Sequence, residues 1–339
     1  MNQKQSFICG ISSFELSKEE EKFLSDSQPW GIILFKRNCK NKEQLAELTN
    51  SLRLILNSPD LPIFIDQEGG RVQRLGPPVW PKYPAGQAFA DLYEIKPELG
   101  ERGVWLSSRL MAHDLIELGI DADCLPVLDV PVPGAHDVIG DRAYGCEPTI
   151  IAHLGQLAAD GLLAGGVLPV VKHIPGHGRA GADSHHELPV VDAPRSELEA
   201  IDFLPFQKLN HLPMAMTAHV VYTAFDSKHP CSTSKVVIED VIREKIGFDG
   251  LLMSDDVSMN ALHGEIDARV DACFAAGCDF ALHCNGDLDE MRLVAEKTPV
   301  LEGRALERAD RALEERKAPQ AFDVDAGRAE LEALLLNLN

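Results

Sequence analysis

The stretch TIIAHLGQLAADGLLAGGVLPVVK, residues 149–172, contains the repeating unit that decides the fold. Its first part, 149–165, places apolar residues three and four positions apart, which is the spacing of an amphipathic helix. Its last part, 167–172, is a run of apolar and β-branched residues that is too short for a helix. A strand that is apolar on both faces is typical of a parallel sheet buried under helices. The stretch therefore predicts a helix followed by a buried parallel strand.

The same unit recurs along the chain. Strands of this kind are expected at 7–12, 30–35, 62–66, 124–130, 167–172, 214–219, 250–254 and 278–284. Segments with helical period lie between them, at 43–56, 99–118, 149–165, 195–210, 234–246 and 261–276. Eight strands that alternate with helices predict an α/β fold, a (β/α)8 barrel of the TIM type. An open doubly wound sheet is the alternative, but no GxGxxG follows the first strand and no Walker sequence is present.

Element ends and domain limits follow from the same pattern. Ser232 or Thr233 is expected to cap the helix 234–246, which should end near Gly247. We expect residues 1–339 to form a single catalytic barrel domain, with 302–339 as closing C-terminal helices on its exterior. The segment 67–97 is rich in Gly and Pro and predicts a functional loop over the barrel mouth.

The composition excludes several classes of partner. The chain has 32 Lys and Arg against 53 Asp and Glu, a formal net charge of −21, which repels nucleic acid and anionic membranes. No signal sequence is evident, and no apolar run is long enough to span a bilayer. The 8 cysteines form no CxxC pair, so they indicate reduced thiols in the cytoplasm rather than disulfides or a zinc site. We expect a cytoplasmic monomer.

Polar residues follow the predicted strands at their carboxyl ends. In a (β/α)8 barrel this is the end at which active sites are built. The residues concerned are Asp66, Asp129, Lys172, His173, His219, the run Ser254, Asp255 and Asp256, and finally His283. A purely structural pattern would leave several of these strand ends apolar, so the set as a whole predicts an active site.

Two short motifs contain the groups suited to catalysis. KHIPGHGRAGADSHHELP, 172–189, has no HxH or HExxH pair, so it does not favour a metal site. In it Asp183 precedes His185 by two residues and is close enough to orient the imidazole. In the second motif, Asp255 or Asp256 is a candidate nucleophile toward an anomeric carbon, and the other would cap a helix beginning near Met259. The residues alone leave that choice open.

Taken in order, six segments resemble the bacterial β-N-acetylglucosaminidases of glycoside hydrolase family 3, over most of the chain. Within that family the chain is most similar to the cytosolic β-hexosaminidases of peptidoglycan recycling. The segments are IDQEGGRVQRL at 65–75, IGDRAYG at 139–145, KHIPGHG at 172–178, ADSHHELP at 182–189, MTAHVVY at 216–222 and MSDDVSM at 253–259.

The resemblance implies a role for each matching residue. Asp255 would be the nucleophile and His185 the acid/base, with Asp183 as its dyad partner. The residues implied to bind the sugar are Asp66, Arg74, Arg142, Lys172 and His173. The implied substrate is a GlcNAc-containing muropeptide, cleaved with retention of configuration and without cofactor or metal. His177, His186, His219 and His283 are expected to support the site or to pack.

Three other functions remain open at this point. A phosphorylase on the same scaffold is one, because an imidazole acid/base does not repel an incoming phosphate. A non-catalytic sugar-binding barrel is another, although the Asp183, His185 and Asp255 set argues against it. A metal-dependent hydrolase is the least favoured, and activity that survives EDTA would exclude it.

Overall fold

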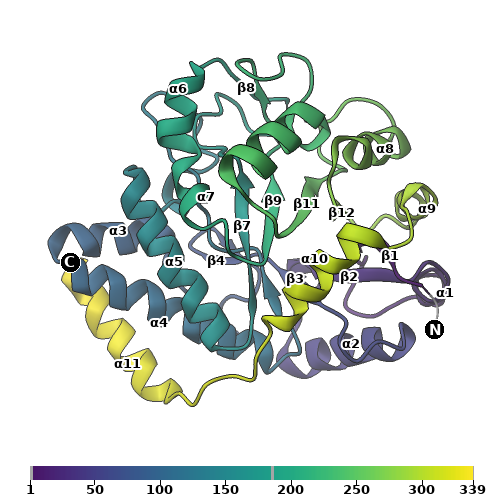
Figure 1. Cartoon of the computed structure of the whole chain (residues 1–339). Helices are drawn as coiled ribbons and strands as arrows, with labels where there is room; N and C mark the ends of the chain where they lie inside the picture. Colours follow the sequence, from purple (N-terminus) through teal and green to yellow (C-terminus); the bar gives the residue numbers. More distant parts are fainter. Residues whose placement is uncertain (1–2, 185–186, 339) are drawn as a thin grey trace.

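The structure, a computed structural model, describes residues 3–184 and 187–338. Its strands close into a parallel barrel of eight, in the order β1-β12-β11-β9-β7-β6-β3-β2 (Figure 1). In chain order they are β1 (Gln5–Cys9), β2 (Pro29–Leu34), β3 (Ile63–Ile65), β6 (Ala122–Asp123), β7 (Leu168–Ile174), β9 (Met214–Thr217), β11 (Leu251–Asp256) and β12 (Phe280–His283). This confirms the predicted (β/α)8 barrel.

Helices surround the strands (Figure 1). The α-helices are α1 (Lys18–Ser27), α2 (Lys42–Ile55), α3 (Gly86–Ile95), α4 (Pro97–Ile116), α5 (Pro148–Ala164), α6 (Arg195–Glu197), α7 (Leu204–Lys208), α8 (Ile266–Ala276), α9 (Leu288–Lys297), α10 (Gly303–Glu314) and α11 (Val324–Leu335). Wider π-type turns form η3 (Leu198–Asp202) and η5 (Val237–Ile246), and short 3-10 turns form η1 (Lys36–Asn38), η2 (Gly140–Arg142), η4 (Cys231–Thr233) and η6 (Leu336–Leu338). In the described part of the chain, no helix has the length and apolar character needed to cross a membrane.

The fourth barrel strand is shorter than the sequence predicts. β6 covers only 122–123, and the predicted run 124–130 continues as irregular chain with one isolated bridge, from Val127 to Lys172. Pro126 lies in this run and has no amide hydrogen to donate to a neighbouring strand. The regular strand pairing therefore ends at residue 123, although the apolar pattern of the sequence continues to residue 130.

Two helix starts and one loop also differ from expectation. The predicted cap at Ser232 or Thr233 is wrong, because Ser234 Oγ accepts the hydrogen bond from the Val237 amide at 3.2 Å. The helix does end at Gly247, whose φ of 77° lies in the left-handed region that glycine tolerates. The helix expected from 261 begins at Ile266. The segment 67–97 is not a plain loop, since it contains α3 and the hairpin of β4 (Gln67–Gly69) and β5 (Val72–Gln73).

Side chains from alternate strand positions fill the barrel interior. The ring of Trp30 lies 5.9 Å from that of Phe64 and 4.6 Å from that of Phe280. The same buried cluster includes Leu301, Ala309 and Ala312, which come from α10 and the residues just before it. Because α10 contacts β11, and the chain before it pairs with the start of β1 through Val300 and Gln5, this helix closes the amino-terminal end of the barrel and leaves the opposite end for the site (Figure 1).

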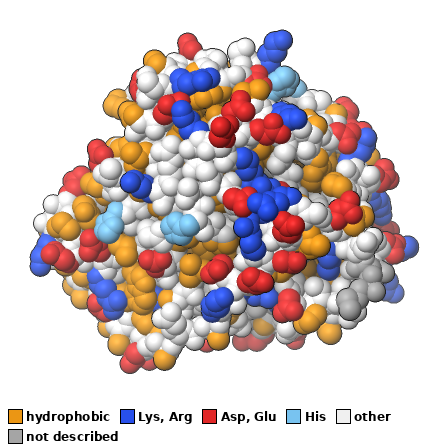
Figure 2. All heavy atoms as spheres, viewed as in Figure 1, with side chains coloured by type: hydrophobic (Ala, Val, Ile, Leu, Met, Phe, Trp, Pro, Cys, Tyr) orange, Lys and Arg blue, Asp and Glu red, His pale blue; other side chains and the backbone are white. Residues whose placement is uncertain are grey.

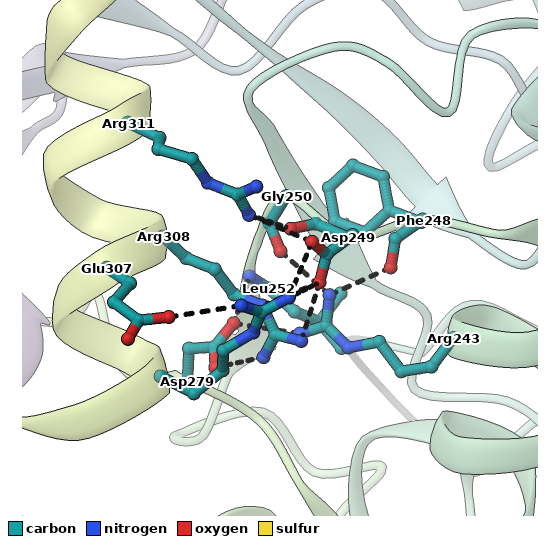
Figure 3. Close-up of polar contacts among 10 residues, drawn as sticks. Arg243, Phe248, Asp249, Gly250, Leu252, Asp279, Glu307, Arg308 and Arg311 are labelled. Carbon is teal, nitrogen blue, oxygen red and sulfur yellow. Dashed lines mark hydrogen bonds and ion pairs between the residues drawn. The ribbon is translucent and has the colours of Figure 1, made fainter.

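Arginines on α10 fasten that helix to the barrel. Arg308 donates to Asp249 at 3.0 Å and to Asp279 at 2.9 Å, and Arg311 reaches Asp249 from one turn further along (Figure 3). Asp279 also accepts from Arg243 at 2.8 Å. Acidic and basic side chains lie next to one another across the face on which α10 is seen (Figure 2). These ion pairs thus hold α10 against the barrel in addition to its apolar contacts.

We expect Arg308→Ala to lower the free energy of unfolding by about 2 kcal/mol, because it removes charge-assisted hydrogen bonds to the buried Asp279. Urea unfolding followed by circular dichroism measures the change. Arg304→Ala is the matched control, since Arg304 is 58% exposed and its pairs should contribute little. Equal losses in the two variants would contradict the assignment of Arg308 as the buried contact.

Candidate active site

A cavity of roughly 260 Å³ opens at the carboxyl ends of the strands. The polar residues that line it come from the ends of β3, β7 and β11 and from three loops. They are Asp66, Glu68, Arg74, Arg142, Lys172, His173, His177, Ser184, Asp255 and Asp256. The structure thus brings together all five residues predicted to bind sugar, and it adds the predicted nucleophile.

A buried lysine organises one wall of this cavity. Lys172, at 2% exposure, lies with its Nζ 2.8 Å from Asp66 Oδ1 and 2.6 Å from Glu68 Oε1. Arg74 completes the cluster by donating to Asp66 Oδ2 at 2.8 Å. Asp66 follows β3 and Lys172 lies on β7, so this ion pair spans β6, the strand between them.

The charges in this cluster control its protonation. Burial alone would raise the pKa of Asp66, but the Lys172 and Arg74 cations outweigh it and hold that pKa well below its usual range. Burial would likewise lower the pKa of Lys172, yet the two carboxylates raise it above its usual value. Lys172 is therefore an ammonium and Asp66 a carboxylate at neutral pH.

Glu68 is a member of the cluster that the sequence analysis did not single out. Arg142 holds it with two parallel bonds, Nε to Oε2 at 2.8 Å and Nη2 to Oε1 at 2.9 Å. Burial would raise the pKa of Glu68, but Arg142 and Lys172 together lower it to about 2. The feature of the sequence that could have identified Glu68 is its position in the IDQEGG segment, directly after a predicted strand. Arg142 therefore faces a protein carboxylate as well as the cavity.

Asp129, in the irregular chain that follows β6, positions two histidines. Asp129 is completely buried and accepts from His173 Nδ1 at 2.7 Å and from the His177 amide at 2.6 Å. Burial would raise the pKa of Asp129, but the contact with His173 lowers it to about 2. A carboxylate on Nδ1 fixes the imidazole orientation and leaves Nε2 as the nitrogen of His173 available to the cavity.

His177 connects the histidine pair to the loop that contains the predicted dyad. Its Nε2 lies 3.2 Å from Ser184 Oγ, and its ring packs edge-on to His173 at 5.6 Å. Burial, reinforced by the nearby His173, lowers the pKa of His177 to about 4, so the ring is neutral at physiological pH. Ser184 is buried and stands between Asp183 and His185 in the sequence. His185 and His186 lie outside the described residues.

The two aspartates at the end of β11 have different surroundings. The Asp256 carboxylate accepts from the Ser258 amide at 3.0 Å, the Ser258 hydroxyl at 2.7 Å and the Cys284 amide at 3.0 Å. It does not cap a helix near Met259, as the sequence led us to expect, because α8 begins only at Ile266. Asp256 thus ties the loop after β11 to the end of β12.

Asp255 occupies the position beside the cavity. Its amide donates to Thr217 Oγ1 at 3.3 Å, and its Oδ1 accepts from the Asp256 amide at 2.8 Å. The bond to Thr217 positions the Asp255 backbone, and the bond from the Asp256 amide helps to hold the carboxylate where it lines the cavity.

The remaining histidines at the strand ends are fully buried. His219 places Nδ1 2.7 Å from Ser232 Oγ and Nε2 3.0 Å from the Asp256 carbonyl, so it supports the loop after β11. His283 contacts Glu290 at 2.9 Å. Neither ring lines the cavity among the described residues.

Fold and site together define a class. A (β/α)8 barrel that gathers carboxylates, cations and imidazoles around one cavity at its carboxyl end is an enzyme scaffold. Residues 5–314 match the family described as the glycosyl hydrolase family 3 N-terminal domain. The chain belongs to this family.

Individual relatives agree with this assignment. A β-hexosaminidase of Alkalilimnicola ehrlichii is 39% identical over 282 residues, which cover 82% of this chain and 80% of the relative. The crystal structure of NagZ from Neisseria gonorrhoeae in complex with N-trifluoroacetyl-D-glucosamine superposes with a TM-score of 0.88 at 32% identity, covering 98% of both chains. A family 3 β-N-acetylglucosaminidase of a Paenibacillus strain gives a TM-score of 0.83 at 29% identity, covering 97% of this chain and 66% of the other.

Proposed function

We propose that this protein is an exo-acting, retaining β-N-acetylhexosaminidase. It removes terminal non-reducing GlcNAc from GlcNAc-1,6-anhydroMurNAc-peptides in the cytoplasm, as a step of peptidoglycan recycling. The observation that carries the proposal is that Asp255 and Ser184 line the same cavity. Ser184 is the residue between Asp183 and His185, so the proposed nucleophile and the proposed acid/base segment meet there, although the two segments follow different strands.

The reaction proceeds in two displacements. An oxygen of Asp255 attacks the anomeric carbon, the glycosidic C–O bond breaks, and the departing oxygen takes a proton from His185. Water then gives its proton to His185 and attacks the glycosyl-enzyme, which releases Asp255 and GlcNAc. Asp183 holds the imidazole of His185 in the useful tautomer and stabilises its protonated form.

The cluster opposite Asp255 suits a neutral sugar. Asp66 and Glu68 are charged acceptors for hydroxyl groups, and Lys172, Arg74 and Arg142 are charged donors. Their mutual pairing preorganises the groups before substrate arrives, so little reorganisation is needed on binding. The bond between His177 and Ser184 supports a defined position for the segment that contains the dyad.

The test compares two substrates in wild type and His185→Ala. An aryl β-GlcNAc with a good leaving group needs little protonation of the departing oxygen, so its kcat/KM should fall less than about tenfold. The natural disaccharide needs that proton, so its kcat/KM should fall by about 10²- to 10⁴-fold. On the aryl substrate, His185→Ala should also release a burst of phenolate, because the variant lacks the base that activates water to hydrolyse the glycosyl-enzyme.

His211→Ala is the control, because His211 is an exposed histidine at the amino-terminal end of the barrel. Equal losses on both substrates would refute the acid/base role of His185. Turnover that requires inorganic phosphate would instead assign phosphorolysis to the same site.

A further inference from the structure

A second hollow of about 580 Å³ lies beside the candidate active site. Its walls come from the chain after β11, from α8, from the loop that follows β10 (Val221–Tyr222) and from the start of η5. We call it the rim groove. In Figure 1 its elements lie at the carboxyl ends of the strands, next to α8. None of the roles assigned above uses this groove.

Some residues that line the rim groove lie close in the sequence to residues that line the catalytic cavity. Met259 lines the cavity and Ala261 lines the groove, and two residues of chain span at most about 7 Å. On the other side Ser184 lines the cavity and Leu188 lines the groove. A substituent of three residues on the leaving sugar spans about 10 Å when extended, which is enough to pass from one site to the other.

The groove is basic although the whole chain has a net charge of −21. Lys228 and His263 are exposed on its rim, and within the described ranges no carboxylate pairs with either side chain. Arg269 donates to the carbonyls of Val257, Met259 and Gly264, and no carboxylate of the described residues forms an ion pair with it. Lys235 has one weak pair, with the exposed Glu239 at 3.6 Å.

Asp226 is the one carboxylate among the described residues that line the groove, and the cations Lys228, Lys235 and Arg269 outnumber it. The Asp226 carboxylate accepts from the Ser234 hydroxyl at 2.8 Å and from the His229 ring at 3.0 Å, and it also holds the amides of Lys228 and His229. Donors within the loop thus occupy the oxygens of the Asp226 carboxylate. The floor between the cations is made of small apolar side chains, among them Ala268, Ala272 and Leu262.

We propose that the rim groove binds the anionic peptide stem of the muropeptide, with carboxylates on the basic rim and methyl-sized side chains on the alanine floor. The inference rests on the proposed function, since it names where the rest of that substrate lies. It makes Lys228, Lys235 and Ala272 specificity-determining residues that never touch the sugar.

The experiment measures kcat/KM on three substrates: an aryl β-GlcNAc, GlcNAc-1,6-anhydroMurNAc without peptide, and the same disaccharide with its tripeptide. Wild type should favour the tripeptide form, and 0.5 M NaCl should reduce this preference because exposed charges are screened. Lys228→Glu combined with Lys235→Glu should lower kcat/KM on the tripeptide form by about tenfold and leave the other two substrates unchanged.

Two further variants make the test specific. Lys208→Glu makes the same change of charge on an exposed lysine at the end of α7, away from the groove, and should leave all three rates unchanged. Ala272→Phe fills the floor without changing charge and should also reduce the preference for peptide. Thermal unfolding checks that each variant is folded.

The outcomes separate the two proposals. If wild type cleaves the aryl substrate and neither disaccharide, the proposed muropeptide substrate fails, and the groove proposal fails with it. If wild type cleaves both disaccharides equally, or the groove variants slow all three substrates alike, only the groove proposal is overturned. A change of sedimentation coefficient in the groove variants would assign the surface to a contact between copies of the chain, which also overturns it.

Discussion

Asp255→Ala should lower kcat on GlcNAc glycosides by about four to six orders of magnitude, because loss of a covalent nucleophile removes the whole double-displacement route. The side chain lines the cavity, and its position is fixed by contacts with Thr217 and Asp256. Alanine keeps the hydrogen bond from its own amide to Thr217 Oγ1 and loses the one that the Asp256 amide donates to Oδ1 of Asp255. The expected loss is therefore catalytic, with the melting temperature close to that of wild type.

A covalent label locates the nucleophile directly. A 5-fluoro GlcNAc fluoride should inactivate wild type with one added mass on the peptide that contains Asp255, and it should not modify Asp255→Ala. The N-acetyl group occupies the 2-position, so the fluorine is placed at C5 to slow release of the intermediate.

Asp256→Asn is the matched comparison. The Asp256 carboxylate is committed to Ser258 and Cys284, so its replacement should loosen the loop and cost stability, with a far smaller effect on kcat. A label on Asp256, or full activity in Asp255→Ala, would overturn the assignment.

Lys172→Met should lower the free energy of unfolding by about 3 kcal/mol, because it leaves two buried carboxylates with one cation fewer. Lys172 is 2% exposed and lies between Asp66 and Glu68, and methionine preserves most of its volume. Urea unfolding at pH 7 measures the loss. Lys22→Met, at an ion pair whose side chains are 77% and 65% exposed, should show no measurable change.

The pH dependence identifies charge as the cause. The pKa of Glu68 is about 2 in the folded wild type, below the ordinary value of 4.5 that applies when the chain is unfolded. Wild type therefore has this stabilisation in full above pH 4.5 and loses it as the pH falls toward 2. The Lys172→Met variant has less of this stabilisation to lose. The difference in the free energy of unfolding between wild type and variant should therefore decrease as the pH falls from 4.5 toward 2. A difference that stays constant from pH 7 to pH 3 would indicate a packing defect instead.

Combining Lys172→Met with Asp66→Asn should restore part of the lost stability, because one carboxylate is removed together with the cation and Glu68 keeps its paired bonds with Arg142. The same double variant should be inactive, because the proposed sugar-binding wall has lost Asp66 and Lys172. Stability and activity thus move in opposite directions, which a general loosening of the barrel mouth would not produce.

The fold could be predicted from the sequence because its signal is local. Each strand is a short apolar run and each helix has its own period, so burial on both faces of a strand is visible without knowledge of the partner strand. The exceptions have local causes too. Pro126 ends the ladder of the fourth strand early, and Ser234 replaces Ser232 as helix cap because Ser232 is bonded to Thr217 and His219 inside the barrel.

The site could be predicted only as a set of residues. Rules for barrels place the residues after each strand at one mouth, and this is where Asp66, Lys172, His173 and Asp255 lie. The rules do not say which groups pair. Glu68 was therefore missed as the third member of the cluster, and Asp256 was expected at a helix cap that does not form.

By itself, then, the sequence determined the barrel, the end of the barrel that contains the site and the residue types gathered there. Tertiary structure decided that Ser258 and Cys284 hold the Asp256 carboxylate while Asp255 lines the same cavity, that Lys172 is shared by two acids, and that His177 reaches Ser184. The physical reason is distance along the chain. The periodicity of the sequence predicts which face of its own helix or strand a residue lies on. The pairings named here join segments that come together only when the barrel closes.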